Sequence, residues 1–234
     1  MVHFHGGAFA SGDLDNGYTV AHLLEGAGAV VVSVAYPLTP FPQPVDTGYG
    51  VLQWVHRHRT KLGGQGALVY LAGEEAGGNL AAAVALMARD QAHPPLAGQI
   101  LLSPMLDPCV GSASQRRTTG DAVDCKWVQG WRTFLRCPRA AVHPYAVPAS
   151  AHRLAGLPPT LVLVGDTDPM RDEALAYAAR LHAAGLQVTQ HVFAKAEKWP
   201  EPLLETGPHE CPCAGAVQEE FRRFFEATRC RESS

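Results

Sequence analysis

The sequence lacks several features that would point to particular classes of protein. Of its 234 residues, 19 are Lys or Arg and 22 are Asp or Glu, so the formal net charge is only −3. This balance gives no support to binding of nucleic acid or of an anionic membrane. No apolar run approaches the roughly 20 residues that span a bilayer, and the first residues lack the basic and apolar regions of a signal peptide. We therefore expect a cytoplasmic protein with no nucleic-acid or membrane partner.

The sequence also lacks a disulfide scaffold, since six cysteines in a chain of this length do not make one. Cys211 and Cys213 lie beside His209 and Glu210, which could suggest a metal site. Their spacing is not a standard zinc pattern, however, and no second pair of ligands occurs elsewhere. We expect ordinary reduced thiols here, with no metal and no cofactor.

The chain does contain alternating short apolar runs and helical patterns, which are typical of βα units around a parallel sheet. We predict strands at residues 2–5, 29–36, 68–73, 99–103, 160–165 and 188–194, and helices at 14–26, 44–61, 76–90, 172–184 and 217–228. The fold class is therefore α/β, with a mostly parallel sheet and helices on both faces, in a single domain of residues 1–234. Residues 107–155 mix prolines, tryptophans and charges, with one helix predicted at 126–135. We interpret this stretch as a cap-like insertion over the strand ends.

One strand-to-helix junction has the frame of a nucleophile elbow. Gly73 and Gly77 flank position 75 in the spacing G-x-S-x-G, where a sharp turn pushes the central side chain out above the sheet. The central residue here is Glu75, not serine. A second glycine-rich turn, residues 5–9, directly follows the first predicted strand. Its backbone N–H groups, those of Gly6 and Gly7, could form an oxyanion hole together with the N–H of Ala76.

These motifs and their order resemble the hormone-sensitive-lipase-like branch of the α/β hydrolases, which contains bacterial acetyl esterases and carboxylesterases. Residues 5–8 resemble the family's H-G-G-G/A motif, and the matching segments further along are 12–15, 35–40 (family D-Y-R-L-A-P), 73–80 (family G-D-S-A-G-G-N-L) and 168–173 (family D-P-L-R-D-E). The resemblance extends from Val2 to about Phe193. It implies an α/β-hydrolase fold, an acyl or ester-like small-molecule ligand, and Asp168 as the acid of the catalytic triad. The alternative interpretation of Asp168 is a helix cap, because Pro169 follows it.

The sequence departs from the family pattern in three ways. Glu75 replaces the nucleophilic serine. The place of the triad histidine falls at about Lys198, and His209 is the only histidine further along. The first two strands of the family fold are absent, so the strand at 29–36 would lie at an exposed sheet edge. We expect a homodimer to cover that edge, or a start codon placed too late in the gene.

Two hypotheses about function remain open at this point. In the first, Glu75 acts as a carboxylate nucleophile or base, with Asp168 and His209 completing the catalytic residues. In the second, Lys198 replaces the triad histidine and pairs with Glu75 or Asp168, which leaves a ligand-binding pseudoenzyme without a proton shuttle. Serine-type ester hydrolysis is excluded at position 75 by either hypothesis. We expect His5 to hold the glycine turn, and Trp127 and Trp131 to pack within the insertion.

Overall fold

A computed structural model of the chain describes residues 1–108, 112–119, 125–195 and 212–229. Its centre is a six-stranded sheet in the order β2-β1-β3-β4-β5-β6, and every neighbouring pair of strands is parallel. The strands are β1 (Val2–Phe4), β2 (Val32–Val34), β3 (Tyr70–Glu74), β4 (Gly98–Leu102), β5 (Thr160–Gly165) and β6 (Val188–Phe193). All six carboxyl ends therefore meet at one edge of the sheet, where parallel α/β folds place their ligand sites.

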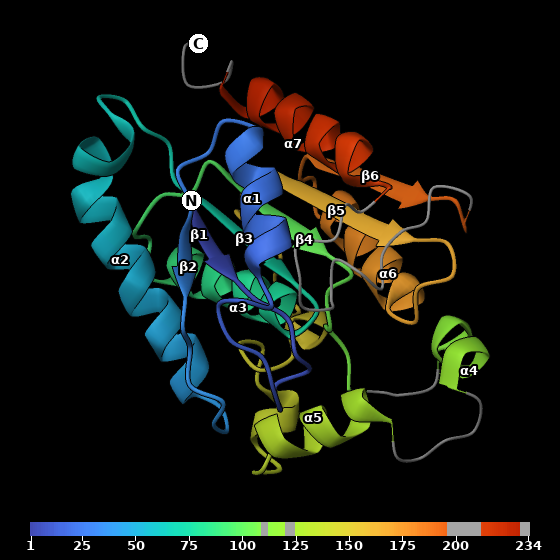
Figure 1. Cartoon of the computed structure of the whole chain (residues 1–234). Helices are drawn as coiled ribbons and strands as arrows, with labels where there is room; N and C mark the ends of the chain where they lie inside the picture. Colours follow the sequence, from blue (N-terminus) through green and yellow to red (C-terminus); the bar gives the residue numbers. More distant parts are fainter. Residues whose placement is uncertain (109–111, 120–124, 196–211, 230–234) are drawn as a thin grey trace.

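Helices cover both faces of the sheet (Figure 1). They are α1 (Tyr18–Gly26), α2 (Gln43–Gly63), α3 (Ala76–Asp90), α4 (Ala113–Thr119), α5 (Lys126–Phe134), α6 (Arg171–Ala183) and α7 (Ala214–Arg229), with short 3₁₀ turns at Ala140–Val142 and Pro148–Ser150. Helices α2, α3 and α6 share one hydrophobic core on the first face, and α1 and α7 share the core on the second. The fold class predicted from the alternating pattern is confirmed.

Alternation along the buried strands decides which core each side chain enters. In β3, Leu71 packs against α2 and α3, whereas its neighbour Tyr70 packs against α7. In β4, Leu101 enters the first core and Ile100 enters the second. Since both faces are covered, such strands carry continuous apolar runs, which is why the sequence identified them so clearly.

Most predicted elements lie where the sequence placed them, and the predicted bounds of α3 and β5 agree with the structure at both ends. Helix α1 begins at Tyr18, later than predicted, because the Asp13 side chain accepts the N–H groups of Asp15 and Asn16 at 2.9 and 3.3 Å and folds this segment into a turn. Helix α4 was not predicted. The assignment of residues 107–155 as a cap-like insertion in a single domain stays a prediction.

Three other expectations can be compared with the described residues. Strand β2 lies at one end of the sheet, as expected, while the homodimer proposed to cover it stays a prediction. The expectation of a reduced thiol at Cys213 is wrong, because this cysteine is disulfide-bonded. Among the described residues, no helix is long and apolar enough to cross a membrane, and no three His, Cys, Asp or Glu side chains group as metal ligands would.

The contact of α3 with β1 depends on the absence of a side chain at Gly77. A Cβ atom there would lie 2.0 Å from the carbonyl oxygen of Phe4, within the backbone of β1. We expect Gly77→Ala to lower the free energy of unfolding by about 1–3 kcal/mol, the usual cost of forcing atoms into a packed core. Gly50→Ala in α2 is the matched control, because nothing lies within 4 Å of its added Cβ, and it should stabilise by about 0.5–1 kcal/mol. Urea unfolding measures the free energy of unfolding of both variants. An equal change in the two variants would contradict the packing argument.

Candidate functional site

The elbow at Glu75 is a strained turn between β3 and α3. Glu75 has φ 54° and ψ −115°, a conformation that residues with a side chain rarely adopt. Its N–H donates to the carbonyl oxygen of Leu102 at 3.0 Å, and its own carbonyl oxygen accepts the N–H of Met105 at 2.9 Å. A Cβ at Gly73 would lie 2.2 Å from the carbonyl oxygen of Gly77. The two glycines are therefore required by the turn, as the elbow frame predicts.

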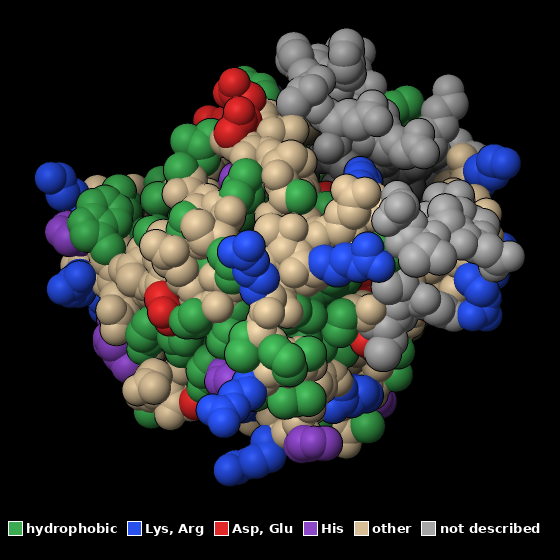
Figure 2. All heavy atoms as spheres, turned by 90° about the horizontal axis from the view of Figure 1, so that it is seen from below, with side chains coloured by type: hydrophobic (Ala, Val, Ile, Leu, Met, Phe, Trp, Pro, Cys, Tyr) green, Lys and Arg blue, Asp and Glu red, His purple; other side chains and the backbone are tan. Residues whose placement is uncertain are grey.

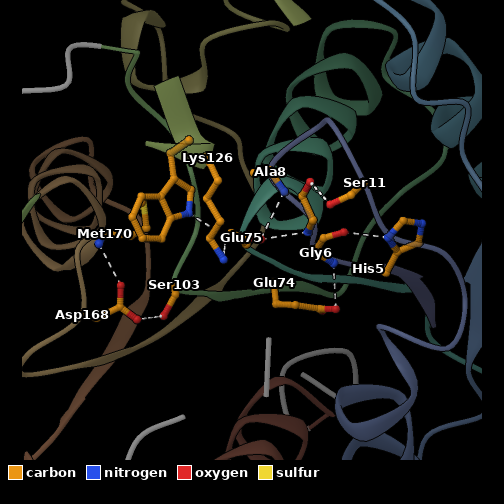
Figure 3. A network of polar contacts seen from close by, with 12 residues as sticks. His5, Gly6, Ala8, Ser11, Glu74, Glu75, Ser103, Lys126, Asp168 and Met170 are labelled. Atoms are coloured by element: carbon orange, nitrogen blue, oxygen red, sulfur yellow. Dashed lines mark hydrogen bonds and ion pairs between the residues drawn. The ribbon is translucent and has the colours of Figure 1, made fainter. Parts of the chain in front are cut away.

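The carboxylate of Glu75 lies in a cradle of backbone N–H groups from the glycine turn after β1 (Figure 3). Gly7 N donates to Glu75 Oε2 at 2.8 Å and Ala8 N donates to the same oxygen at 3.2 Å. Gly7, Ala8 and Phe9 all have positive φ (115°, 51° and 60°), which turns successive N–H groups toward one point. Such a concave arrangement of N–H groups binds anions. We call these two N–H groups the Gly7–Ala8 cradle.

The second oxygen of the Glu75 carboxylate is held by α5. Trp127 Nε1 donates to Glu75 Oε1 at 2.6 Å, and Lys126 Nζ lies 3.5 Å from that oxygen. The Lys126 ammonium also lies 5.0 Å from the centre of the Trp127 ring. Only 2% of the Glu75 side chain is exposed, whereas 59% of the Lys126 side chain is. The carboxylate is thus removed from water but receives four donors, three of them at hydrogen-bond distance.

Glu74, one residue earlier, supports the same glycine turn from the opposite side. Gly6 N donates to Glu74 Oε1 at 3.0 Å, and His3 Nε2 lies 2.8 Å from Glu74 Oε2. The other nitrogen of His3, Nδ1, is 3.1 Å from Ser33 Oγ in β2. This chain of contacts joins the middle of β1 and of β2 to the end of β3. The two adjacent carboxylates therefore bind consecutive N–H groups of the turn, Glu74 that of Gly6 and Glu75 those of the cradle.

The imidazole of His5 fixes the first residue of the turn. His5 Nδ1 donates to the carbonyl oxygen of Gly6 at 2.7 Å, and the ring stacks on Tyr36 with 4.3 Å between ring centres. Burial lowers the pKa of His5, which favours the neutral ring. Tyr36 donates its hydroxyl to the carbonyl oxygen of His5 at 2.8 Å. Burial, together with the charges of Glu74 and Glu75, raises the pKa of Tyr36 well above its usual value, so the hydroxyl stays a donor.

Asp168 lies in the turn after β5 and is directed toward the end of β4 (Figure 3). One of its carboxylate oxygens, Oδ2, accepts the hydroxyl of Ser103, and the other, Oδ1, accepts the N–H of Met170 at 2.7 Å. Ser103 is buried and has φ 42°. The Met170 contact closes a turn before α6 and is not a helix cap, because α6 is capped at Met170 without a side-chain hydrogen bond. The position of Asp168 at a strand's carboxyl end fits the triad-acid interpretation, which stays a prediction.

A family model described as the alpha/beta hydrolase fold matches residues 1–197 of the sequence. The chain belongs to the α/β hydrolases. The resemblance to the hormone-sensitive-lipase-like branch is supported by the esterases among its relatives.

Two curated relatives and one solved structure illustrate this α/β-hydrolase family. Esterase LipI of Mycobacterium tuberculosis is 34% identical over 200 residues, which cover 82% of this chain and 62% of LipI. Gibberellin receptor GID1C of Arabidopsis thaliana is 35% identical over 205 residues, covering 80% of this chain and 58% of the receptor. The structure of a thermostable esterase from Pseudomonas putida ECU1011 superposes with a TM-score of 0.83 at 30% identity, covering 95% of this chain and 72% of that one. The chain thus spans less than two thirds of the length of these curated relatives.

The structure brings together part of the predicted site. Glu75 and Gly7 meet, whereas the N–H of Gly6 is used by Glu74 and Ala8 supplies the second cradle donor instead. Ala76 is the first residue of α3, directly after the elbow. His209 and Lys198 lie outside the described residues, so their roles stay predictions.

The contacts of Glu75 with Trp127 and Lys126 were not predicted from the sequence. Trp127 was predicted to pack only, and it donates a hydrogen bond to Glu75; Trp131 packs, as predicted. Lys126 was not singled out at all.

Glu173, in the first turn of α6, is a further acid beside this site, half-buried as a residue but with one carboxyl oxygen fully buried. Its Oε2 accepts the N–H of Asp107 at 2.9 Å, while its buried Oε1 has no hydrogen-bond partner in the described part of the chain. Burial is the largest influence on the pKa of Glu173, and the nearby charges of Asp107 and Asp168 add to it. Together, and against the opposing backbone hydrogen bonds, they raise this pKa from 4.5 to about 8. Glu173 is therefore protonated in the folded protein at neutral pH.

This raised pKa predicts that stability falls as the pH rises from about 4.5 to 8. In that window the folded state binds one more proton than the unfolded state, so each pH unit costs up to about 1.4 kcal/mol. Glu173→Gln keeps an acceptor for the Asp107 N–H but cannot ionise. Urea unfolding at pH 5 and pH 8 should show the variant gaining up to about 3 kcal/mol on the wild type across this interval. Glu25→Gln is the control, because the Glu25 side chain is 71% exposed. If the free energy of unfolding changed equally with pH in all three proteins, this would contradict a neutral Glu173.

Proposed function

We propose that this chain is a non-catalytic, ligand-binding member of the α/β-hydrolase family, with Glu75 in the position of the nucleophilic serine. The observation that carries the proposal is that the Glu75 carboxylate fills the Gly7–Ala8 cradle. In an acyl-transfer enzyme, N–H groups at this place serve as the oxyanion hole and receive the substrate's carbonyl oxygen. Here that position is already taken by an oxygen of the protein itself.

The chemistry of the side chain explains how glutamate fits this place. In an acylated serine, the acyl carbon is two bonds from Cβ and carries an oxygen directed into the oxyanion hole. In glutamate, the carboxylate carbon is also two bonds from Cβ and carries Oε2, which accepts both cradle N–H groups. Glu75 therefore imitates the acylated form of the missing serine, and an ester carbonyl cannot occupy the same space.

The alternative, in which Glu75 is a carboxylate nucleophile or base, is less favoured by the same contacts. A carboxylate that receives hydrogen bonds from Gly7, Ala8 and Trp127 has both oxygens engaged by donors, and this lowers its tendency to attack a carbonyl carbon or to reach a water molecule. To react, Glu75 would also have to leave the donors that offset its burial. The relatives support both uses of the fold, since some are named esterases and two are named gibberellin receptors.

The expected result with esters separates the two readings of Glu75. We predict that the purified chain does not hydrolyse short p-nitrophenyl esters above the rate in buffer, and that Glu75→Gln is equally inactive. Turnover by the wild type that disappears in Glu75→Gln would contradict the proposal and support a catalytic carboxylate. A gain of turnover in Glu75→Ser would show that the remaining residues still support acyl transfer, which would identify the loss of serine as the sole defect.

The cradle should accept an external carboxylate when the internal one is removed. Glu75→Gly suits the positive φ at this position and leaves the N–H groups of Gly7 and Ala8 without their acceptor. We expect acetate to raise the melting temperature of Glu75→Gly. At an acetate concentration tenfold above its Kd, the free energy of unfolding should rise by about 1.4 kcal/mol. Chloride at the same ionic strength should have little effect. Wild type and Glu25→Ala are the controls, and an equal response to acetate in all three proteins would count against an occupied cradle.

A further inference from the structure

The outer face of α2 carries a basic stripe at its carboxyl-terminal end. Trp54, Arg57, His58 and Lys61 follow one another at intervals of three, one and three residues, which places them on one side of a helix. The opposite side of the same turns, with Leu52 and Val55, is buried against the sheet and α3. The four outward residues are defined here as the Trp54–Lys61 face.

This face has no acidic counterpart. No Asp or Glu occurs anywhere from Thr47 to Gly73, although the whole chain has a net charge of −3. In the described structure, neither Arg57 nor Lys61 pairs with a carboxylate, and the neighbouring Arg59 donates only to the carbonyl oxygen of His56, at 3.0 Å. In contrast, the arginines on the outer face of α7 pair with glutamates of the same helix, as Arg223 does with Glu219 at 3.1 Å. The cationic charge on α2 is therefore available to a partner.

Trp54 adds a large aromatic surface to these cations. Its side chain is 44% exposed, and its ring stacks on His58 with 4.5 Å between centres. Figure 2 shows hydrophobic surface projecting at the side where α2 lies, with blue and purple side chains next to it. An exposed tryptophan flanked by Lys and Arg is the combination found at the level of lipid headgroups, where the ring is half immersed and the cations meet phosphates.

We propose that the Trp54–Lys61 face docks the protein reversibly on the surface of an anionic lipid bilayer. Arg57 and Lys61 would contact acidic headgroups, and Trp54 would insert at the interface. A nucleic acid fits less well, because its recognition relies on many phosphate contacts, whereas these cations lie within five residues of one helix. The near-neutral total charge does not reveal this local excess, so the proposal differs from the expectation of no membrane partner that the total charge suggested. The proposal does not depend on the role of Glu75.

Sedimentation with vesicles tests the proposal directly. We expect the full chain to bind vesicles of phosphatidylcholine mixed with phosphatidylserine at low salt, to release at high salt, and to leave pure phosphatidylcholine unbound. Each cation near an anionic surface raises partitioning about fivefold. The double variant Arg57→Glu, Lys61→Glu should therefore bind at least about tenfold more weakly, and Trp54→Ala should bind more weakly than wild type at every salt concentration.

A variant with the same change of charge elsewhere provides the control. Arg222→Glu, Arg223→Glu alters two exposed arginines on α7 that pair with Glu219 at 3.6 and 3.1 Å. It should retain vesicle binding, and circular dichroism confirms that all variants fold. Equal loss of binding in both double variants would overturn the proposal, as would absence of wild-type binding to anionic vesicles. Wild-type binding to DNA or to an acidic polypeptide at concentrations that leave the vesicles unbound would also overturn it.

Discussion

The carboxylate of Glu75 and the two N–H groups of the Gly7–Ala8 cradle form the interaction on which the rest of the site depends. A carboxylate that is almost wholly buried is costly unless donors replace the water it loses, and here the donors come from the turn after β1 and from α5. The contact joins three parts of the chain that are distant in sequence. The conformations of the glycine turn, the elbow and the start of α5 are thus stabilised together.

The same interaction changes what the elbow can do. The strained backbone at position 75 and the N–H groups aimed at one point are features that an acyl-transfer enzyme uses to form and stabilise a tetrahedral intermediate. With glutamate in the turn, its own oxygen receives these N–H groups. Under the proposed function, the fold and the turn are retained while the place of the substrate's carbonyl oxygen is filled by the protein itself. Glu74 and His3 support the turn through contacts that do not involve Glu75.

Much of the fold was predictable from the sequence because buried parallel strands leave a strong signal. The apolar runs of β3, β4 and β5 and the alanine-rich pattern of α3 fixed their places closely, and the spacing of Gly73 and Gly77 located the elbow. Helix α1 was placed too early because the side-chain contacts of Asp13, which compete with the helix, depend on local geometry that periodicity does not record. Helix α4 is short and polar, so it carried no periodic signal.

The site was harder to predict than the fold, because its contacts join elements that sequence spacing does not relate. Lys126 and Trp127 lie about fifty residues from Glu75, and a tryptophan in a helical pattern ordinarily indicates packing. The choice between Gly6 and Ala8 as a cradle donor depends on the rotation of single peptide groups, which the positive φ values of Gly7 and Ala8 decide.

A crystal structure of the protein, determined from crystals grown in acetate, tests the central claim most directly. The account predicts that Glu75 Oε2 accepts the N–H groups of both Gly7 and Ala8, that Trp127 donates to the other oxygen, and that no acetate or water lies in the cradle. A Glu75 side chain turned away from the turn, with acetate or water bound to those two N–H groups, would contradict it.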